Sequence, residues 1–253
     1  MKSYEPEMSF GEDVAEIYDE VAVHAGNDSG EPAVGDVAAT VTFLEQLARG
    51  GSALELAIGT GRIALPLSAR GITVDGIDFS EAMIDVLRAK PGGDRLSVTM
   101  GNYADVGVPG NYRLIYLVAN SLSNLLTQDE QVRCFQNVAA HLTDDGSFVH
   151  EAGVPNWLYR LQNSQYVMAE AIEVNEVRLD IARHDPVTQR LEESHVRLSN
   201  DRVRVSPIVT RYAWPSELDL MARIAGLRLK ERWDGWNREP FTATGNCISV
   251  YGH

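Results

Sequence analysis

Cysteine is scarce in this sequence. Only Cys134 and Cys247 occur among its 253 residues, far apart along the chain. Two such residues exclude a disulfide-stapled scaffold, and they lack the close spacing that metal-binding cysteines need. We therefore expect two buried, reduced thiols, and we predict no metal centre.

Basic residues are also few, and no stretch is both long and apolar. The chain has 22 Lys and Arg against 36 Asp and Glu, which gives a formal net charge of −14. Because nucleic-acid phosphates are bound by clustered Lys and Arg, this balance argues against nucleic acid as a partner. No apolar run reaches membrane-spanning length, and the acidic, polar start lacks the features of a signal peptide. We therefore expect a cytoplasmic protein without membrane contact.

Hydrophobic residues make up 44% of the chain, which suits one domain with a small elaboration. One stretch organises the rest. Residues 54–58 are an apolar run, broken only by Glu55, that is typical of a buried parallel strand. Gly59-Thr60-Gly61 then turns the backbone, and a helical stretch covers 63–69. A second strand over 72–77 closes on Asp78. This order of strand, glycine turn, helix and acid-terminated strand predicts a nucleotide-binding βαβ unit.

The residue types in this unit have specific chemical uses. Gly59 and Gly61 lack a Cβ, so the backbone there can take unusual dihedrals and lie against a ligand. A carboxylate at Asp78 can accept hydrogen bonds from both hydroxyls of a ribose. Ala64 stands where a dinucleotide fingerprint has its third glycine, an allowed variant, so the glycines alone leave NAD open. Glu55 on the first strand would repel a pyrophosphate but suits a ligand with a cationic amino acid end.

This region resembles the class I S-adenosylmethionine (SAM)-dependent methyltransferases. Their first motif, an acid followed by Gly-x-Gly, matches Glu55-Leu-Ala-Ile-Gly-Thr-Gly-Arg62. Their second motif matches Val74-Asp-Gly-Ile-Asp-Phe-Ser-Glu-Ala-Met83, and further matches are Gly101-Asn-Tyr-Ala-Asp105 and Leu142-Thr-Asp-Asp-Gly-Ser-Phe148. The four motifs occur in the family's order within residues 40–152.

The resemblance implies a fold, a cofactor and a set of contacts. The fold is a doubly wound α/β domain with a seven-stranded, mainly parallel sheet that ends in an antiparallel hairpin. The cofactor is SAM, and its product is S-adenosyl-L-homocysteine. Where Asn102 stands, the family more often has an acid that accepts a bond from the adenine amino group, and the Asn oxygen can accept the same bond. The residues implied in cofactor binding are Glu55, Ala57, Gly59, Thr60, Gly61, Arg62, Asp78, Phe79, Met83, Gly101, Asn102, Tyr103, Ala119 and Asn120.

Hydrophobic periodicity predicts the other elements of the core. Ser80 is the expected N-cap of one helix, Ser216 of another, and Ser123 or Asn124 of a third. Helices are expected at residues 13–23, 37–48, 81–89, 128–141 and 217–225, and strands at 96–100, 113–118, 147–152, 227–233 and 246–251.

An insert separates the fifth strand from the last helix. Residues 156–169 look helical or loop-like, and alternation then predicts three antiparallel strands over 171–182, 190–198 and 203–212. In the resembled group, which includes amino-sugar N-methyltransferases, such an insert covers the acceptor site or forms a homodimer contact. We therefore divide the chain into a lid helix and loop (1–36), a SAM-binding core (37–153), a substrate-side insert (154–213) and a closing helix and hairpin (214–253).

A hydroxyl or ammonium acceptor must lose a proton, and the sequence offers several bases. His150 and Glu151 end the fifth strand, and because successive strand residues point to opposite faces, at most one faces the cleft. We favour Glu151, since related methyltransferases often place a polar residue there. In the resembled family a Tyr-Asp pair of the lid faces the pocket, which implies Tyr18, although its ring could equally pack on the sheet edge. His24 lies in the same region. Residues predicted on the acceptor side are Ser121, Trp157, Tyr166, Trp236 and Arg238.

Together these patterns predict a SAM-dependent methyltransferase that acts at N or O of a small-molecule acceptor, natural-product-like or amino-sugar-like. Three alternatives stay open. The chain could be a catalytically silent module that keeps the SAM site, a SAM-binding enzyme of another transfer type, or an NAD-dependent oxidoreductase. Binding of SAM and release of S-adenosylhomocysteine would separate them.

Overall fold

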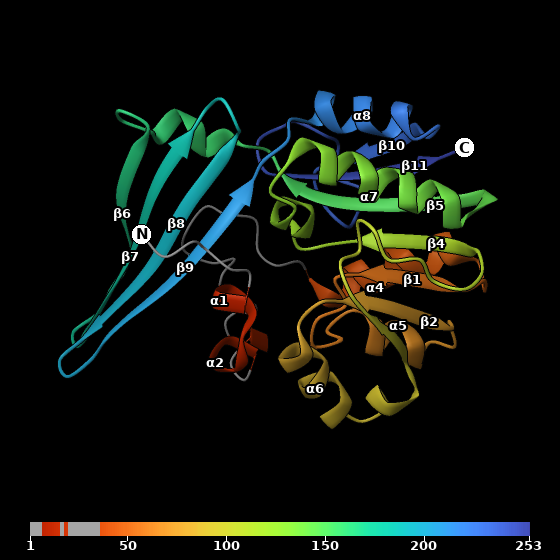
Figure 1. Ribbon diagram of the computed structural model, residues 1–253, viewed down its shortest axis with the longest axis horizontal. Coiled ribbons are helices and arrows are strands. Elements are labelled where there is room, and N and C mark those ends of the chain that lie inside the picture. The colour runs from red at the N-terminus through yellow and green to blue at the C-terminus, as the bar shows by residue number, and fades with distance from the viewer. Residues whose placement is uncertain (1–6, 16–17, 20–35) are drawn as a thin grey trace.

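The computed structural model describes residues 7–15, 18–19 and 36–253, which form two β-sheets with flanking helices (Figure 1). In this part of the chain the larger sheet has the strand order β10-β11-β5-β4-β1-β2-β3. Pairing is parallel from β5 to β3, whereas β11 runs antiparallel to β5 and β10. The strands are β1 (Ala53–Leu56), β2 (Val74–Asp78), β3 (Ser97–Met100), β4 (Tyr112–Leu117), β5 (Leu142–Gly153), β10 (Arg228–Trp233) and β11 (Asn246–Gly252).

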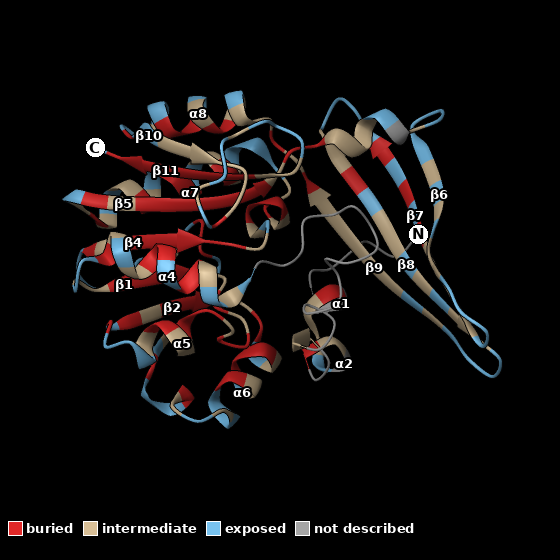
Figure 2. Ribbon diagram, turned by 180° about the vertical axis from the view of Figure 1, so that it is seen from behind, coloured by how far each residue is buried: buried red, intermediate tan, exposed pale blue. Residues whose placement is uncertain are grey.

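The predicted seven-stranded, doubly wound sheet with its closing antiparallel hairpin is thereby confirmed. Its central strands are apolar because helices cover both faces. Along β1, Leu54 and Leu56 point into one hydrophobic cluster while Ala53 points into the other, and Leu114 and Ile115 of β4 alternate in the same way. The sheet therefore separates two cores (Figure 2).

Helices from the first half of the chain cover one face. These are α4 (Val37–Ala48), α5 (Ala64–Ala69) and α6 (Glu81–Ala89), and they pack on the strands through one of the two clusters. The opposite face is covered by α7 (Gln128–His141) and α8 (Pro215–Ile224), which also pack against each other. Because β1 and β2 lie between these layers, residues at their carboxyl ends open onto one edge of the sheet.

The predicted helix caps are partly right. Ser80 caps α6, since its Oγ accepts a backbone N–H at 3.2 Å. The prediction of Ser123 or Asn124 as the cap of α7 is wrong, because Thr127 begins that helix with a capping box to Glu130. Ser123 instead donates from its Oγ to a backbone carbonyl inside the preceding loop.

The last helix also begins differently from the expectation. Trp214 is the N-cap of α8 and Pro215 its first residue, so Ser216 is not the cap. A proline is favoured at this position because its fixed φ suits the helix and its missing N–H would have no partner there. Gly226 follows the helix with a φ of 85°, as predicted for a helix-ending glycine.

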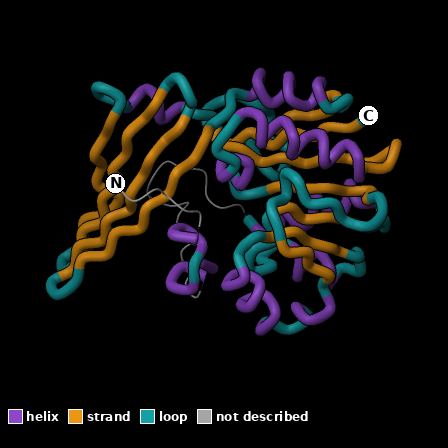
Figure 3. Tube along the Cα trace, viewed as in Figure 1, coloured by secondary structure: helices purple, strands orange, loops and turns teal. Residues whose placement is uncertain are grey.

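The smaller sheet is a separate antiparallel layer beside the core (Figures 1 and 3). The strand order within it is β6-β7-β8-β9. A short 3-10 helix, η3 (Asn156–Arg160), leads into it from β5. Its strands are β6 (Gln165–Ile172), β7 (Glu176–Asp185), β8 (Arg190–Ser199) and β9 (Val203–Arg211).

The insert thus has one strand more than the sequence predicts. Residues 165–169 belong to β6, whereas the sequence analysis expects a helix or loop over 156–169. Val174 is 98% exposed and lies in the turn between β6 and β7, so the predicted strand over 171–182 is in fact the end of β6, a turn and most of β7. The error arose because Ile172, Val174 and Val177 alternate without a glycine or proline to mark the turn.

The described part of the N-terminal region bridges the two sheets. It includes α1 (Glu7–Phe10) and α2 (Glu12–Ala15). The Ser9 hydroxyl donates to the carbonyl of Pro207 in β9 at 2.7 Å, and the Ser80 hydroxyl donates to the carbonyl of Phe10 at 2.7 Å. The rest of the predicted 13–23 helix, apart from 18–19, and the loop with His24 lie outside the described residues. Within the described ranges, no helix is long and apolar enough to cross a membrane.

One glycine inside the sheet allows a test of this packing. A Cβ on Gly76 in β2 would lie 2.4 Å from Cδ1 of Ile58. We expect Gly76→Ala to lower the free energy of unfolding by about 1–3 kcal/mol through overpacking, measured by urea denaturation. Gly107→Ala is the matched control, because a Cβ there meets no atom within 4 Å. Equal stability of the two variants would contradict the packing described here.

Candidate active site

The glycine turn after β1 has a left-handed backbone at three positions. Ala57 has a φ of 55°, Gly59 of 53° and Gly61 of 74°. For Ala57 this conformation costs about 1–2 kcal/mol, because its Cβ approaches the following carbonyl. A Cβ on Gly61 would lie 3.0 Å from Cδ1 of Leu87, whereas one on Gly59 would meet only a carbonyl oxygen at 4.0 Å. The turn therefore packs tightly on one side and leaves open space at Gly59.

Asp78 fixes this turn to the end of β2. Its Oδ2 accepts the Gly59 N–H at 2.7 Å, and its Oδ1 accepts the Ser80 N–H at 2.9 Å. The side chain is buried. Burial raises the pKa of Asp78, and the N–H donors of Ser80 and Gly59 oppose that rise. The carboxylate is thus held in place at the carboxyl edge, beside the turn.

Glu55 is a second buried carboxylate in the same region. The Tyr116 hydroxyl donates to its Oε2 at 3.0 Å, and the Ala64 N–H also bonds to it. Burial raises its pKa to about 8; the Tyr116 hydrogen bond and the charge of Arg62 oppose this rise, and Asp78 adds to it. Among the described residues, Arg62 is the cation that acts on Glu55, while the neighbouring Asp78 opposes ionisation of Glu55, so a further positive charge would stabilise the Glu55 carboxylate.

Tyr18 and Asp19 lie against this site. Thr60 Oγ1 donates to Asp19 Oδ1 at 2.6 Å, and Lys90 forms an ion pair with Asp19 while donating to the Thr60 carbonyl at 2.8 Å. Burial opposes ionisation of Asp19, but the bonds from Lys90 and Thr60 prevail and lower its pKa. Burial raises the pKa of Tyr18, and the charges of Arg62, Asp78, Asp19 and Glu55 act on its hydroxyl.

Glu151 lies two residues before the end of β5 and is buried on the same side of the sheet. Its Oε2 accepts the Ala119 N–H at 2.7 Å, and its Oε1 accepts Nε1 of Trp236 at 3.2 Å and Nδ2 of Asn246 at 3.4 Å. Ala119 and Asn120 have left-handed φ values of 54° and 55°, so the bond from Ala119 holds the loop after β4 in a strained shape. Burial raises the pKa of Glu151, and the bonds from Ala119 and Trp236 oppose the rise.

His150 lies on the opposite face, as the alternation predicts. It is fully buried beside Phe135 and Phe148 in an aromatic cluster. Burial and the charge of Arg232 lower its pKa to about 3, so the ring is neutral. Neither ring nitrogen has a hydrogen-bond partner within the described part of the chain. The structure therefore does not bring His150 together with Glu151 as a catalytic candidate.

The remaining predicted cofactor residues lie around the ends of β3 and β4. Oδ1 of Asn102 accepts the Ala104 N–H at 2.9 Å. Tyr103 is buried, and its hydroxyl donates to the Ser121 carbonyl at 2.7 Å, so it supports the loop after β4 from inside the core. Phe79 follows β2 and contacts Phe10 edge to face, and Met83 is buried in α6. Gly101 follows β3 and has a φ of 148°.

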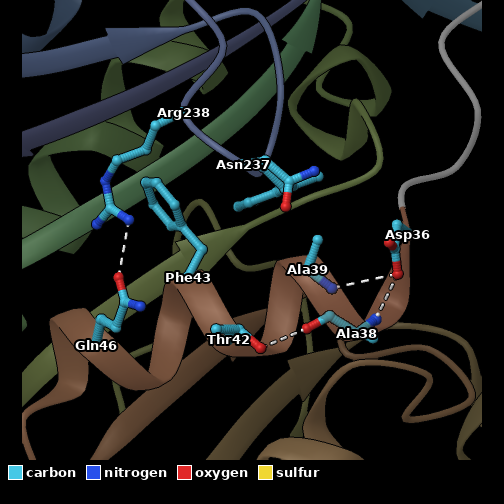
Figure 4. A pocket seen from close by; sticks show the side chains of 9 residues that line it. Asp36, Ala38, Ala39, Thr42, Phe43, Gln46, Asn237 and Arg238 are labelled. Carbon is cyan, nitrogen blue, oxygen red and sulfur yellow. Dashed lines mark hydrogen bonds between the residues drawn. The ribbon is translucent and has the colours of Figure 1, made fainter.

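The predicted acceptor-side residues fall into three places. Trp236 contacts Glu151 and packs edge to face on Phe43. Arg238 follows in the same loop, lies over the Phe43 ring and donates to Gln46, beside a groove along α4 (Figure 4). Of these two residues, Trp236 contacts Glu151, whereas the contacts described for Arg238 are with α4.

Two other candidates, Trp157 and Tyr166, belong to the insert. The last, Ser121, lies in the loop after β4. Trp157 packs on His184 and Tyr212, and the Tyr166 hydroxyl donates to Asp180 in β7. Ser121 donates from its Oγ to the Val118 carbonyl at 2.8 Å. The sequence analysis missed Tyr116, Lys90 and Asn246, whose partners are distant in the chain. No local pattern marks any of the three.

The sheet order, the antiparallel β11 and the glycine turn between two strand-borne acids define the class I methyltransferase fold. Residues 53–146 match the methyltransferase domain family. The solved CcbJ methyltransferase from Streptomyces caelestis is 34% identical, with a TM-score of 0.86 over 98% of this chain and 99% of that one. This chain therefore belongs to the class I SAM-dependent methyltransferases, and SAM is the cofactor of that family.

Curated relatives are more distant. A putative methyltransferase YqeM from Bacillus subtilis is 28% identical over 134 residues, which cover 52% of this chain and 51% of the relative. A dTDP-3-amino-3,6-dideoxy-alpha-D-glucopyranose N,N-dimethyltransferase from Streptomyces fradiae is 27% identical over 168 residues, 66% of this chain and 63% of the relative. The matched regions thus span about half to two thirds of these two proteins.

The residues at the carboxyl edge fit such a cofactor chemically. SAM carries a sulfonium and an ammonium, and the site supplies the buried carboxyls of Glu55 and Asp78. Gly59 leaves room beside them for a ligand backbone contact. This charge balance fits SAM better than a pyrophosphate-containing dinucleotide.

The raised pKa of Glu55 makes a stability prediction for the protein without cofactor. The folded chain keeps this proton up to about pH 8, whereas the ordinary value is 4.5, so folding stability falls as pH rises between these values. We expect Glu55→Gln to unfold with nearly wild-type free energy at pH 5 and to be more stable than the wild type at pH 8.5, by on the order of 2–4 kcal/mol. Urea denaturation at both pH values tests this, and identical pH dependence of the two proteins would refute it.

Proposed function

We propose that this protein transfers the methyl group of SAM to a nitrogen of a small-molecule amine, such as an amino group on a sugar or another natural product. One observation carries the choice of nitrogen over oxygen. The carboxylate of Glu151 already accepts three hydrogen bonds, and His150 lies on the other face of the sheet. A hydroxyl acceptor needs a base in place, whereas an amine can lose its proton to solvent before it binds.

The named relatives support the same choice. The Streptomyces fradiae relative is called an N,N-dimethyltransferase of an amino sugar, and a relative from Streptomyces sp that is 22% identical over 201 residues is called a cypemycin N-terminal methyltransferase. The first name places the methyl groups on nitrogen, and the second names the amino end of a peptide as the place of methylation. The acceptors themselves differ, so the names support a type of acceptor atom rather than one compound.

The geometry of the carboxyl edge supports a set of proposed cofactor contacts. In this proposal Asp78 accepts the ribose hydroxyls, Glu55 faces the cationic amino acid end, and the turn at Gly59 lies along the ligand. Oδ1 of Asn102 has a second lone pair for the adenine amino group beside its bond to Ala104. Tyr18, with its raised pKa, stays a neutral phenol and covers the site from the lid side.

Bound SAM supplies a methyl group that its sulfonium has already activated. The protein's contribution is therefore mainly to hold the acceptor nitrogen in line with the methyl carbon and to exclude water. Glu151 serves this by fixing the loop after β4 through Ala119 and the closing loop through Trp236. We assign Glu151 a positioning role rather than that of a base.

A turnover test with matched acceptors checks the reaction type. We expect S-adenosylhomocysteine to form with amino-sugar acceptors at least about 100-fold faster than with the corresponding hydroxy sugars, followed by mass spectrometry. Asp78→Ala should abolish turnover, and Asp85→Ala, at an exposed position of α6, should leave it intact. Faster methylation of the hydroxy sugars would refute the choice of nitrogen. SAM binding without product from any acceptor would refute the enzymatic function.

The role of Glu151 has its own test. Glu151→Gln keeps an acceptor oxygen for the Ala119 N–H and loses only the two longer bonds from Trp236 and Asn246, so we expect kcat within about tenfold of the wild type and an unchanged pH profile. Glu151→Ala removes all three bonds and should lower kcat about 100-fold. If Glu151 were the base, the Gln variant would lose as much activity as the Ala variant and its pH profile would change.

A further inference from the structure

One face of the insert carries a cluster of polar side chains that the proposed methyl transfer does not use. The antiparallel register pairs Asp180 of β7 with His195 of β8. Glu170 reaches the same place from β6, at an irregularity in its pairing with β7. Tyr166 and Glu193 lie one row further along the same face. Three neighbouring strands thus converge on one point.

Three of these side chains hold their donor atoms close together. Nδ1 of His195 lies 3.0 Å from Oε1 of Glu170 and 3.9 Å from Oδ1 of Asp180. One ligand atom from each of the three lies within 4.8 Å of the other two. Because a zinc ion binds nitrogen and oxygen ligands at about 2.0–2.2 Å, a single ion can contact all three with small side-chain movements.

The cluster has more acceptors than donors. The hydroxyl of Tyr166 has one proton, yet it lies 2.6 Å from Oδ2 of Asp180 and 3.1 Å from Oε1 of Glu193. Asp180 is only 8% exposed, and its Oδ1, which points toward His195, has no hydrogen-bond partner among the described residues. A buried carboxylate oxygen without a donor is costly, and a cation at this point would satisfy it.

We propose that Glu170, Asp180 and His195 form a binding site for a divalent transition metal, best matched by Zn²⁺. One imidazole and two carboxylates are ligands that Zn²⁺ accepts, whereas Mg²⁺ and Ca²⁺ prefer oxygen alone. His195 binds as the neutral imidazole, so the ion replaces the proton shared with Glu170. The His195 side chain is half exposed, which leaves an entry path and room for water as a further ligand.

The ion would join β6, β7 and β8 on one face of the insert. The site is built from three neighbouring strands of this sheet, so its expected effect is on the stability of the insert. It is independent of the acceptor proposed above. The sequence analysis predicts no metal centre because the three ligands are spread over 26 positions in the chain, from 170 to 195.

Calorimetric titration of the full-length, chelator-treated protein tests the site. We expect one Zn²⁺ to bind with micromolar or tighter affinity and MgCl₂ to give no binding under the same conditions. Asp180→Asn and His195→Gln should each weaken Zn²⁺ binding at least tenfold. Glu192→Gln is the matched control, because Glu192 lies on β8 beside these residues but is exposed and pairs with Arg183.

Two further measurements keep the result interpretable. Circular dichroism and the thermal midpoint without metal show whether each variant folds, and Glu170→Gln on the edge strand β6 provides a third ligand change. Co²⁺ added in place of Zn²⁺ should give visible absorption bands that the ligand variants lose and the Glu192→Gln control keeps. Absence of Zn²⁺ binding to the wild type, or unchanged binding by folded His195→Gln, would overturn the proposal.

Discussion

The hydrogen bond from the Gly59 N–H to the Asp78 carboxylate ties the turn after β1 to the end of β2. The other oxygen of Asp78 accepts the Ser80 N–H, and Ser80 in turn caps α6 and donates to the Phe10 carbonyl. One carboxylate therefore links the glycine turn, a helix start and the N-terminal segment. Without it, the left-handed turn would lose its partner on the second strand and the ligand side of the sheet would lose its shape.

Buried carboxyl groups characterise the whole carboxyl edge. Glu55, Asp78 and Glu151 are all buried there, and burial raises the pKa of each. Such groups destabilise the folded chain unless donors or cations compensate. All three receive a backbone N–H donor, but only Glu55 has a pKa raised to about 8, so its ionised form gains most from a positively charged ligand. The buried carboxyl groups thus destabilise the protein without cofactor, and a bound cationic cofactor would remove part of this cost and so bind more tightly.

The nucleotide-binding half could be predicted because its parts are local. Glu55, the glycine turn and Asp78 fall within 24 consecutive residues, and helix and strand periods separate them clearly. The surroundings of Glu151 could not be predicted, because Trp236 and Asn246 are 85 and 95 positions away and reach it only through the pairing of β11 with β5. The insert was partly misread because the turn at Val174 has no glycine or proline and is flanked by apolar residues that continue the strand pattern.

By itself, the sequence determined the order of elements, the alternation that sends His150 and Glu151 to opposite faces, and the acid–glycine–acid pattern of the cofactor edge. These depend on periodicity and backbone freedom, which act over a few residues. Only the tertiary structure decided that Glu151 is occupied by three donors and that Glu170, Asp180 and His195 meet on one face. Strand register and strand order decide which side chains that are distant in the sequence become neighbours. Local sequence preferences determine neither the register nor the order.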